Sequence, residues 1–327
     1  MTAISVENLH KRFGKTHALQ GLSLAVEEGD VYGFLGPNGA GKTTTMRILA
    51  TLLRPDSGTA RVLGHDVIEE ATAVRPVIGY MPDTSGAYRD MLVHEYLEFF
   101  AAAYRVPASQ RGHVVSDCIT LTGLHDKRNE LIEALSRGMR QRLGLARCLV
   151  HDPKVLILDE PASGLDPRAR IEILEVLRAL GDMGKTVLIS SHILSELRHL
   201  CNKICIIDLG KSIYSGTIAE ALERARTAHR LQIRLVDRAQ EASDMLREMD
   251  EIREAHATDG SIVVELVEGI ADFSFVATTL VHKGFALLTI REEEILLEDA
   301  FIRLTDTDTL EAADAPVAAD TTSGNRG

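Results

Sequence analysis

Long apolar runs are missing from this sequence. A membrane-spanning helix needs about 20 consecutive apolar residues, and no stretch of the 327 residues approaches that length. The N-terminus also lacks the apolar core of a secretory signal peptide. We therefore expect the chain to exert any action at a membrane from outside the lipid.

A surplus of basic residues is missing as well. The chain carries 36 lysines and arginines against 48 aspartates and glutamates, which gives a formal net charge of −12. Nucleic acid favours a basic protein face, so this balance argues against DNA or RNA as a partner without excluding a local basic patch.

Cysteine and histidine spacings typical of metal sites are also absent. The four cysteines include no C-x-x-C pair, and the 12 histidines show no ligand spacing. Cys205 lies in an apolar, strand-like run. We expect the cysteines to be reduced, buried thiols, which is consistent with a cytosolic protein.

A glycine-rich loop between a strand and a helix is the most informative stretch that is present. An apolar run at 31–35 precedes the loop, helix-forming residues at 46–50 follow it, and the loop reads Gly36, Pro37, Asn38, Gly39, Ala40, Gly41, Lys42, Thr43, Thr44. This is the order and spacing of a phosphate-binding P-loop, whose N–H groups form an anion nest at a helix N-terminus. Lys42 would reach the β- and γ-phosphates and the Thr43 hydroxyl would ligate Mg²⁺, so the sequence predicts nucleotide binding.

Charged side chains follow two further apolar strands. Large aliphatic residues at 155–158 are followed by Asp159 and Glu160, and a second apolar run at 186–190 ends just before His192. Open parallel sheets bind ligands at the carboxyl edge of their strands. Asp159 could bind Mg²⁺, and Glu160 could act as the base that polarises the attacking water. His192 could donate to a γ-phosphate oxygen.

The remaining periodicity predicts a mixed α/β chain of about two domains. Strands are expected at 4–9, 18–26, 59–63, 77–81, 203–208 and 211–215, and helices at 66–74, 91–104, 109–122, 136–150 and 168–180. Ser136 is a good N-cap, but Arg137 beside it opposes the helix dipole. A bound anion would relieve that conflict; a solvated arginine is the alternative. Phe13 upstream of the P-loop is either an adenine-stacking ring or a core aromatic.

These motifs, in this order, resemble those of the nucleotide-binding subunit of ABC transporters over residues 1 to about 220. The P-loop corresponds to Walker A, the 155–160 run to Walker B and His192 to the switch histidine. Leu135–Met139 is similar to the LSGGQ signature, and Ser163–Asp166 to the D-loop. The resemblance implies a P-loop NTPase fold of the ABC ATPase type, with a helical subdomain at about 84–150.

The resemblance also implies ligands and partners. ATP and Mg²⁺ would be bound by the P-loop, with Phe13 at the adenine-stacking position. Two copies would sandwich two ATP molecules head to tail, each site taking Ser136 and Gly138 from the partner copy and including Asp166 of the D-loop. A separate membrane permease would complete the complex, with this chain peripheral on the cytoplasmic face.

Two positions depart from the common pattern of the family. Asp83 stands where the Q-loop glutamine is usual, which suggests a water-mediated contact to Mg²⁺ or the attacking water; a turn-forming aspartate after Pro82 is the alternative. Arg137 and Met139 replace the first glycine and the glutamine of the signature. A basic residue there resembles the export ATPases that pair with ABC-2-type permeases, including those for drugs or antibiotics.

The C-terminal portion favours the same branch. Its predicted order over 225–305 is β-α-β-β-α-β, a small α+β ferredoxin-like unit, closed by a helix at 295–304. The tail at 306–327 has little apolar content, and we expect it to be disordered.

The sequence thus favours the ATP-hydrolysing subunit of an ABC-2-type exporter of drugs, antibiotics or lipids. The rival is a soluble ABC-type ATPase acting on ribosomes or DNA. Such relatives usually carry tandem cassettes or long heptad insertions, whereas one Walker A motif and no heptad insertion are present.

Overall fold

The chain folds into two compact units, one spanning Met1–Ile218 and the other beginning at Ala219. The computed structural model describes residues 1–83, 86, 88–193, 197–198, 200–225, 229–258, 261–267, 269–270 and 272–292. Each unit has its own buried apolar cluster, so each is described by itself.

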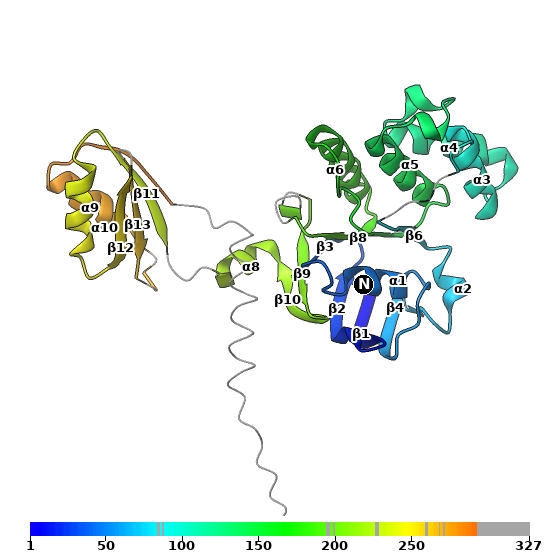
Figure 1. Ribbon diagram of the computed structural model, residues 1–327, viewed down its shortest axis with the longest axis horizontal. Coiled ribbons are helices and arrows are strands. Elements are labelled where there is room, and N and C mark those ends of the chain that lie inside the picture. The colour runs from blue at the N-terminus through cyan, green and yellow to red at the C-terminus, as the bar shows by residue number, and fades with distance from the viewer. Residues whose placement is uncertain are drawn as a thin grey trace, which may run out of the picture. The chain divides into compact units, whose positions relative to one another are not determined.

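A six-stranded sheet forms the centre of the first unit, in the order β10-β9-β3-β8-β7-β6 (Figure 1). Its strands are β3 (Val31–Leu35), β6 (Ile78–Met81), β7 (Val155–Leu158), β8 (Thr186–Ser191), β9 (Lys203–Asp208) and β10 (Lys211–Thr217). All neighbours are parallel except the β9–β10 hairpin. Every residue of β3, β7 and β8 is buried, as their continuous apolar sequences predict.

The parallel register brings the chemically interesting strand ends together. Leu35 at the end of β3 pairs with Ser191 at the end of β8, and Leu158 at the end of β7 pairs with Ile189. The residues that follow these strands therefore emerge at one edge of the sheet. This is the carboxyl edge at which open α/β sheets bind ligands.

An antiparallel sheet covers one face of the central sheet. Its order is β2-β1-β4-β5, built from β1 (Thr2–Phe13), β2 (Thr16–Glu27), β4 (Ser57–Val62) and β5 (His65–Asp66). Helix α1 (Lys42–Leu49) contacts strands of both sheets. The inward-facing residues of these layers form one apolar core, which fixes the base of the P-loop.

Helices lie on the opposite face (Figure 1). They are α3 (Val93–Ala103), α4 (Ala108–Leu121), α5 (Arg137–Leu149) and α6 (Pro167–Asp182), with 3₁₀ turns at His125–Lys127 and Ile132–Ala134. The helices predicted at 91–104, 109–122, 136–150 and 168–180 are confirmed to within about two residues.

The helix predicted at 66–74 is largely wrong. Only α2 (Ala71–Val74) is helical, because the Asp66 carboxylate accepts the N–H groups of Ile68 and Glu69 and closes a turn. Aspartate side chains compete in this way with helical backbone bonds.

The second unit contains α8 (Ile218–Ala225) at its start and a four-stranded antiparallel sheet in the order β12-β13-β11-β14. The elements that follow α8 are β11 (Arg230–Leu235), α9 (Ala239–Arg247), β12 (Ile252–Thr258), β13 (Ser261–Leu266), α10 (Ser274–His282) and β14 (Leu287–Glu292). This is the predicted β-α-β-β-α-β order. The helix predicted at 295–304 and the tail at 306–327 lie outside the described residues.

Candidate active site

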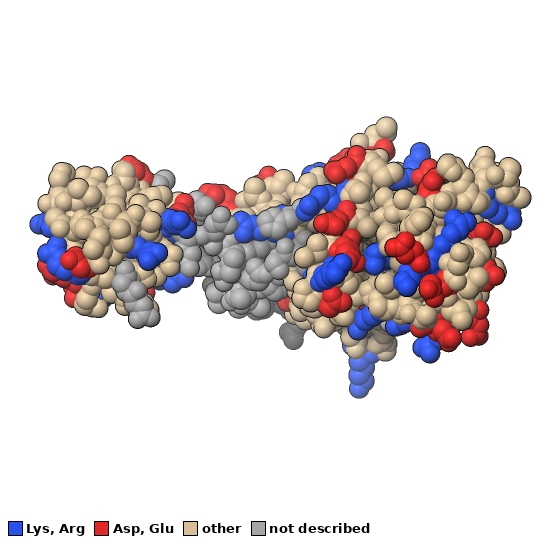
Figure 2. Space-filling view, turned by 90° about the horizontal axis from the view of Figure 1, so that it is seen from above, with Lys and Arg blue, Asp and Glu red and all other residues tan. Residues whose placement is uncertain are grey.

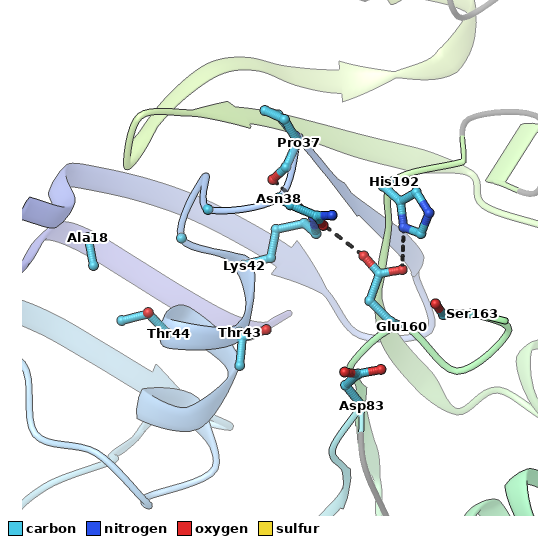
Figure 3. A pocket seen from close by; sticks show the side chains of 12 residues that line it. Ala18, Pro37, Asn38, Lys42, Thr43, Thr44, Asp83, Glu160, Ser163 and His192 are labelled. Atoms are coloured by element: carbon cyan, nitrogen blue, oxygen red, sulfur yellow. Dashed lines mark hydrogen bonds and ion pairs between the residues drawn. The ribbon is translucent and has the colours of Figure 1, made fainter. Parts of the chain in front are cut away.

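A cavity of about 320 Å³ opens at the carboxyl edge of the central sheet (Figure 3). The residues around it come from the P-loop, from the ends of β6, β7 and β8, and from the start of β2: Ala18, Pro37, Asn38, Gly39, Gly41, Lys42, Thr43, Thr44, Asp83, Glu160, Ser163 and His192. Segments far apart in the sequence thus share one wall, because the register of β3 and β8 pairs residues 31–35 with residues 187–191.

The glycines of the P-loop have different structural roles. Gly39 and Gly41 have φ angles of +89° and +112°, in the region that favours glycine, and α1 begins directly after Gly41. Gly36 lies beneath the loop, where a Cβ atom would stand 2.3 Å from the Ile207 carbonyl oxygen. Ala40 is likewise buried, so these two residues support the loop instead of lining the cavity.

The ammonium group of Lys42 lies at the centre of the cavity. Its Nζ donates to the carbonyl oxygens of Gly36 at 2.6 Å and Pro37 at 3.3 Å, and stands 3.4 Å from Glu160 Oε1. The side chain is only 6% exposed. A cation held this way at a helix N-terminus is a strong attraction for a polyphosphate.

Glu160 lies between two basic groups. Beyond Lys42, its Oε2 is 2.7 Å from His192 Nδ1, and Figure 3 shows the carboxylate directed between the two. Its backbone φ is +50°, a left-handed conformation that is uncommon for residues with a side chain. The Glu160 N–H donates to Ser190 Oγ at 2.9 Å, which helps to hold this conformation.

Asp159 is completely buried beside the cavity. Burial raises the pKa of its carboxyl group, while the nearby hydroxyls of Ser190 and Thr43 act to lower it. Ser190 donates to Oδ1 at 2.8 Å, whereas the buried Oδ2 has no hydrogen-bond partner among the described residues. An unpartnered buried carboxylate oxygen is expected where a cation is to be bound.

The chemistry of this wall fits Mg²⁺. Thr43, Asp159 and Asp83 offer a hydroxyl and carboxylate oxygens, the ligands that this hard cation prefers. In the part of the chain that the structure describes, no group of three or more His, Cys, Asp or Glu side chains could hold a metal.

Asp83 belongs to the cavity wall. It follows β6 and Pro82, and Figure 3 shows its carboxylate beside Glu160 and Thr43. Its charge also contributes to the raised pKa of Asp159. The position permits the water-mediated role expected from the sequence, in addition to a role in the turn.

Besides the buried Gly36, Ala40 and Asp159, four predicted site residues lie outside the cavity lining. Phe13 is 49% exposed at the end of β1, with Lys11 Nζ 5.5 Å from its ring centroid. Ser136 caps α5 by accepting the Met139 N–H, and Asp166 caps α6 by accepting the N–H groups of Arg168 and Ala169. A Cβ on Gly138 would lie 2.6 Å from Ala169 Cβ, so this glycine allows α5 to approach α6 closely.

The family resemblance placed Ser163 in the D-loop without giving it a place in the site, and Ala18 and Ser190 were not predicted to belong to the site. Ala18 and Ser163 line the cavity, and Ser190 bonds both Asp159 and Glu160. Ser190 sits at the end of an apolar strand, so a polar residue at that place was the available signal. Ala18 carries no chemical signal at all.

An open parallel sheet with a glycine loop, a lysine, a buried aspartate and a glutamate at its carboxyl edge defines a P-loop nucleotide hydrolase. The sequence profile of the family described as "ABC transporter" matches residues 19–163. The "Nod factor export ATP-binding protein I" of Ralstonia nicotianae is 41% identical over 213 residues, 65% of this chain and 66% of that protein. The "Daunorubicin resistance ATP-binding protein DrrA2" of Streptomyces coeruleorubidus is 35% identical over 318 residues, 96% of this chain and 98% of that protein.

Solved structures agree with these relatives. The cbiO1 protein from Clostridium perfringens, described as part of an ABC transporter complex, has a TM-score of 0.62 and 28% sequence identity, over 68% of this chain and 91% of that one. The chain therefore belongs to the ATP-binding proteins of ABC transporters, in the branch of the ABC-2-type export ATPases. It is an ABC-type ATPase.

Proposed function

We propose that this chain is the ATP-hydrolysing subunit of an ABC-2-type export complex and energises a separate membrane permease. The observation that carries the proposal is the convergence of Lys42, Glu160 and His192 in one cavity with the P-loop. No helix in the described part of the chain is long and apolar enough to cross a membrane. By resemblance to the ABC-2-type exporters, the permease would be a different polypeptide, with this subunit bound at the cytoplasmic face.

Glu160 is the proposed general base. It would polarise the water that attacks the γ-phosphate, an action worth about 10²–10⁴-fold in rate. Glu160 contacts Lys42, so the phosphates of a bound nucleotide would compete with Glu160 for the Lys42 ammonium group. His192 would keep the released carboxylate oriented through its 2.7 Å contact.

Thr43, Asp159 and Asp83 are the proposed Mg²⁺ ligands, the last one through water. When bound with ATP, Mg²⁺ neutralises charge that develops on the phosphates. The elevated pKa of Asp159 belongs to the protein without a cation, and a cation stabilises the ionised carboxylate.

We further propose a head-to-tail homodimer. Ser136 and Gly138 lie outside the cavity of their own chain, as expected if they serve the nucleotide of the partner copy. The N-terminus of α5 can supply donors to a phosphate there. ATP would then bridge the two copies, with Asp166 and the D-loop at the same interface and Phe13 stacked on adenine.

A second hollow, of about 330 Å³, supports docking of a permease. It lies among the end of α1, β6, α3 and α5 and is lined by Ala50, Leu52, Arg75, Ile78, Tyr80, Phe100, Tyr104, Arg147 and Cys148. Leu52 and Tyr104 are 64% and 42% exposed. A groove with an apolar floor and basic side chains fits an amphipathic helix of a partner.

One face of the first unit bears on the rival partners, ribosomes or DNA. On the face of the first unit that Figure 2 presents, basic and acidic side chains are interspersed, with no broad basic area. Nucleic-acid binding relies on such an area. The two named relatives serve Nod factor export and daunorubicin resistance, which supports export of a small lipid-like or drug-like cargo.

Glu160→Gln tests the proposal. The amide keeps the shape of the side chain and loses the base, so we expect ATP binding to persist and turnover to fall by at least 10²-fold. A dimer that depends on ATP should accumulate in size-exclusion chromatography, because the nucleotide bridge is no longer cut.

Unchanged turnover together with a monomer at every ATP concentration would contradict both the base assignment and the sandwich. Co-expression with a candidate permease then tests the export role. ATPase activity of the wild-type complex that does not respond to that permease or its cargo would contradict the pairing.

A further inference from the structure

Arg137, in the first turn of α5, contacts the D-loop of its own chain. Its Nη2 donates to the Ser163 carbonyl oxygen at 3.2 Å. The guanidinium group also lies against Gly164, where a Cβ atom would stand 2.3 Å from Nη2. Gly164 has a φ of +65°, so both its conformation and this close approach favour glycine.

A second hydrogen bond continues from this contact to Glu160. The Ser163 N–H donates to the Glu160 carbonyl oxygen at 3.1 Å and closes the turn over 160–163. The Glu160 N–H is held by Ser190 at 2.9 Å. Both backbone groups of Glu160 are thus bonded, which is what a left-handed non-glycine residue needs in order to persist at a functional site.

Helix α5 is itself fixed against α6. Gly138 packs on Ala169, and the guanidinium of Arg142 pairs with Glu172 at 3.1 Å while its Nη1 donates to the carbonyl oxygens that end α4. Arg137 therefore projects from a helix that its neighbours hold in place. Its side chain can for that reason fix the position of the turn over 160–163.

We propose that Arg137 is a positioning residue for Glu160. By holding the Ser163 carbonyl, it stabilises the turn that keeps Glu160 in its left-handed conformation, aimed between Lys42 and His192. The same contact resolves the unfavourable placement of a cation at a helix N-terminus, because a carbonyl oxygen supplies partial negative charge. The inference rests on the proposed role of Glu160 as the base.

The first test compares Arg137→Ala and Arg137→Lys in the full chain by steady-state ATP hydrolysis. We expect kcat to fall about five- to tenfold in Arg137→Ala, with KM for ATP changed less than twofold, as for loss of one charge-assisted hydrogen bond. Arg137→Lys should recover part of the loss, since an ammonium group can still donate to Ser163. Arg168→Ala is the matched control: this α6 arginine is 90% exposed, pairs with Glu172, and should keep wild-type kcat.

A double-mutant cycle supplies a readout that a general structural role would not move. In a Glu160→Gln background, Arg137→Ala should lower single-turnover hydrolysis less than twofold further, because Arg137 acts through Glu160. Wild-type kcat in Arg137→Ala would overturn the proposal. An undiminished loss in the Glu160→Gln background, or a change confined to KM, would also overturn it and would indicate direct contact with a nucleotide.

The proposed roles of Glu160 and Arg137 are contradicted by different outcomes. Wild-type turnover in Glu160→Gln alone would defeat the proposed base, and with it this inference. A strong loss in Glu160→Gln with none in Arg137→Ala would defeat only the role of Arg137.

Discussion

Lys42 and Glu160 form a buried pair to which we assign phosphate binding and the general base. The two side chains are 6% and 13% exposed and stand 3.4 Å apart. A buried charge is stable only when it is paired, so each side chain has its partner before any phosphate arrives. Removal of Lys42 leaves Glu160 with His192 alone, and removal of Glu160 leaves Lys42 with the carbonyl oxygens of Gly36 and Pro37.

Lys42→Ala tests the P-loop at this scale. It removes the point charge between the phosphates, so we expect ATP affinity to fall by at least tenfold and hydrolysis to become undetectable. Isothermal titration and a phosphate-release assay measure the two effects. Lys127→Ala, a surface lysine paired with Glu130, is the control that should change neither. Wild-type hydrolysis in Lys42→Ala would end the P-loop interpretation.

Asp83→Asn separates the two roles open to that residue. Asparagine keeps the turn preference after Pro82 and removes the charge. If the carboxylate serves Mg²⁺ or the attacking water, permease-stimulated turnover should fall several-fold while ATP affinity stays within about twofold. A titration of Mg²⁺ in the stimulated assay checks this. Stimulated turnover and Mg²⁺ dependence like those of the wild type would leave Asp83 as a turn residue only.

At the scale of secondary-structure elements, His151 connects the helical layer to the central sheet. Its ring stacks on Tyr104, which follows α3, with centroids 3.7 Å apart and an interplanar angle of 4°. It is two residues beyond α5, and its Nε2 donates to the Ile78 carbonyl oxygen of β6 at 2.8 Å. One neutral imidazole therefore ties the helical layer to the edge of the central sheet.

Stability should consequently depend on pH. Burial lowers the pKa of His151 below its ordinary 6.5, while Asp152 acts to raise it and Lys185 to lower it. The unfolded chain takes up a proton as the pH falls through 6.5 and the folded chain does so only at lower pH. The free energy of unfolding therefore falls as the pH drops below 6.5. Above that pH, the titration of His151 does not change stability.

His151→Gln is the variant to compare, since a neutral amide can still donate to Ile78. Between pH 7.5 and 5.5 we expect the wild-type thermal midpoint to drop by about 2–4 °C more than that of the variant. Circular dichroism melting curves at both pH values measure the difference. Parallel pH dependence in the two proteins would show that His151 does not titrate as argued.

At the scale of the whole molecule, the candidate nucleotide site belongs to the first unit. Every residue around the cavity lies between Ala18 and His192, whereas the second unit begins at Ala219 and has a separate core. The second unit is therefore available for a different task, which we propose to be dimer contact or regulation.

Truncation after Ile218 tests this division. The shortened chain should fold and bind ATP with an affinity within about threefold of the full chain, because no cavity residue is removed. Titration of ATP against both proteins, with melting curves to verify folding, measures it. A truncated chain that folds but does not bind ATP would contradict the proposed independence of the two units.

Much of this organisation was predictable because its causes are local. Glycine spacing, an apolar run of strand length and a capping serine act over a few residues, so the P-loop, β7, β8 and α5 follow from the sequence. The wrong helix at 66–74 also has a local cause, but one that apolar periodicity does not reveal: the Asp66 carboxylate accepts N–H groups that a helix would have used.

The sequence by itself determined which residues are candidates to meet a nucleotide: Lys42, Thr43, Asp159, Glu160 and His192 each follow a recognisable strand or loop. Only the tertiary structure decided how they meet. The parallel register joins β3, β7 and β8, and it sets Glu160 between Lys42 and His192 with both of its backbone groups bonded. Arg137 reaches Ser163 only because α5 packs beside α6. Local sequence patterns do not specify the distance between these two helices.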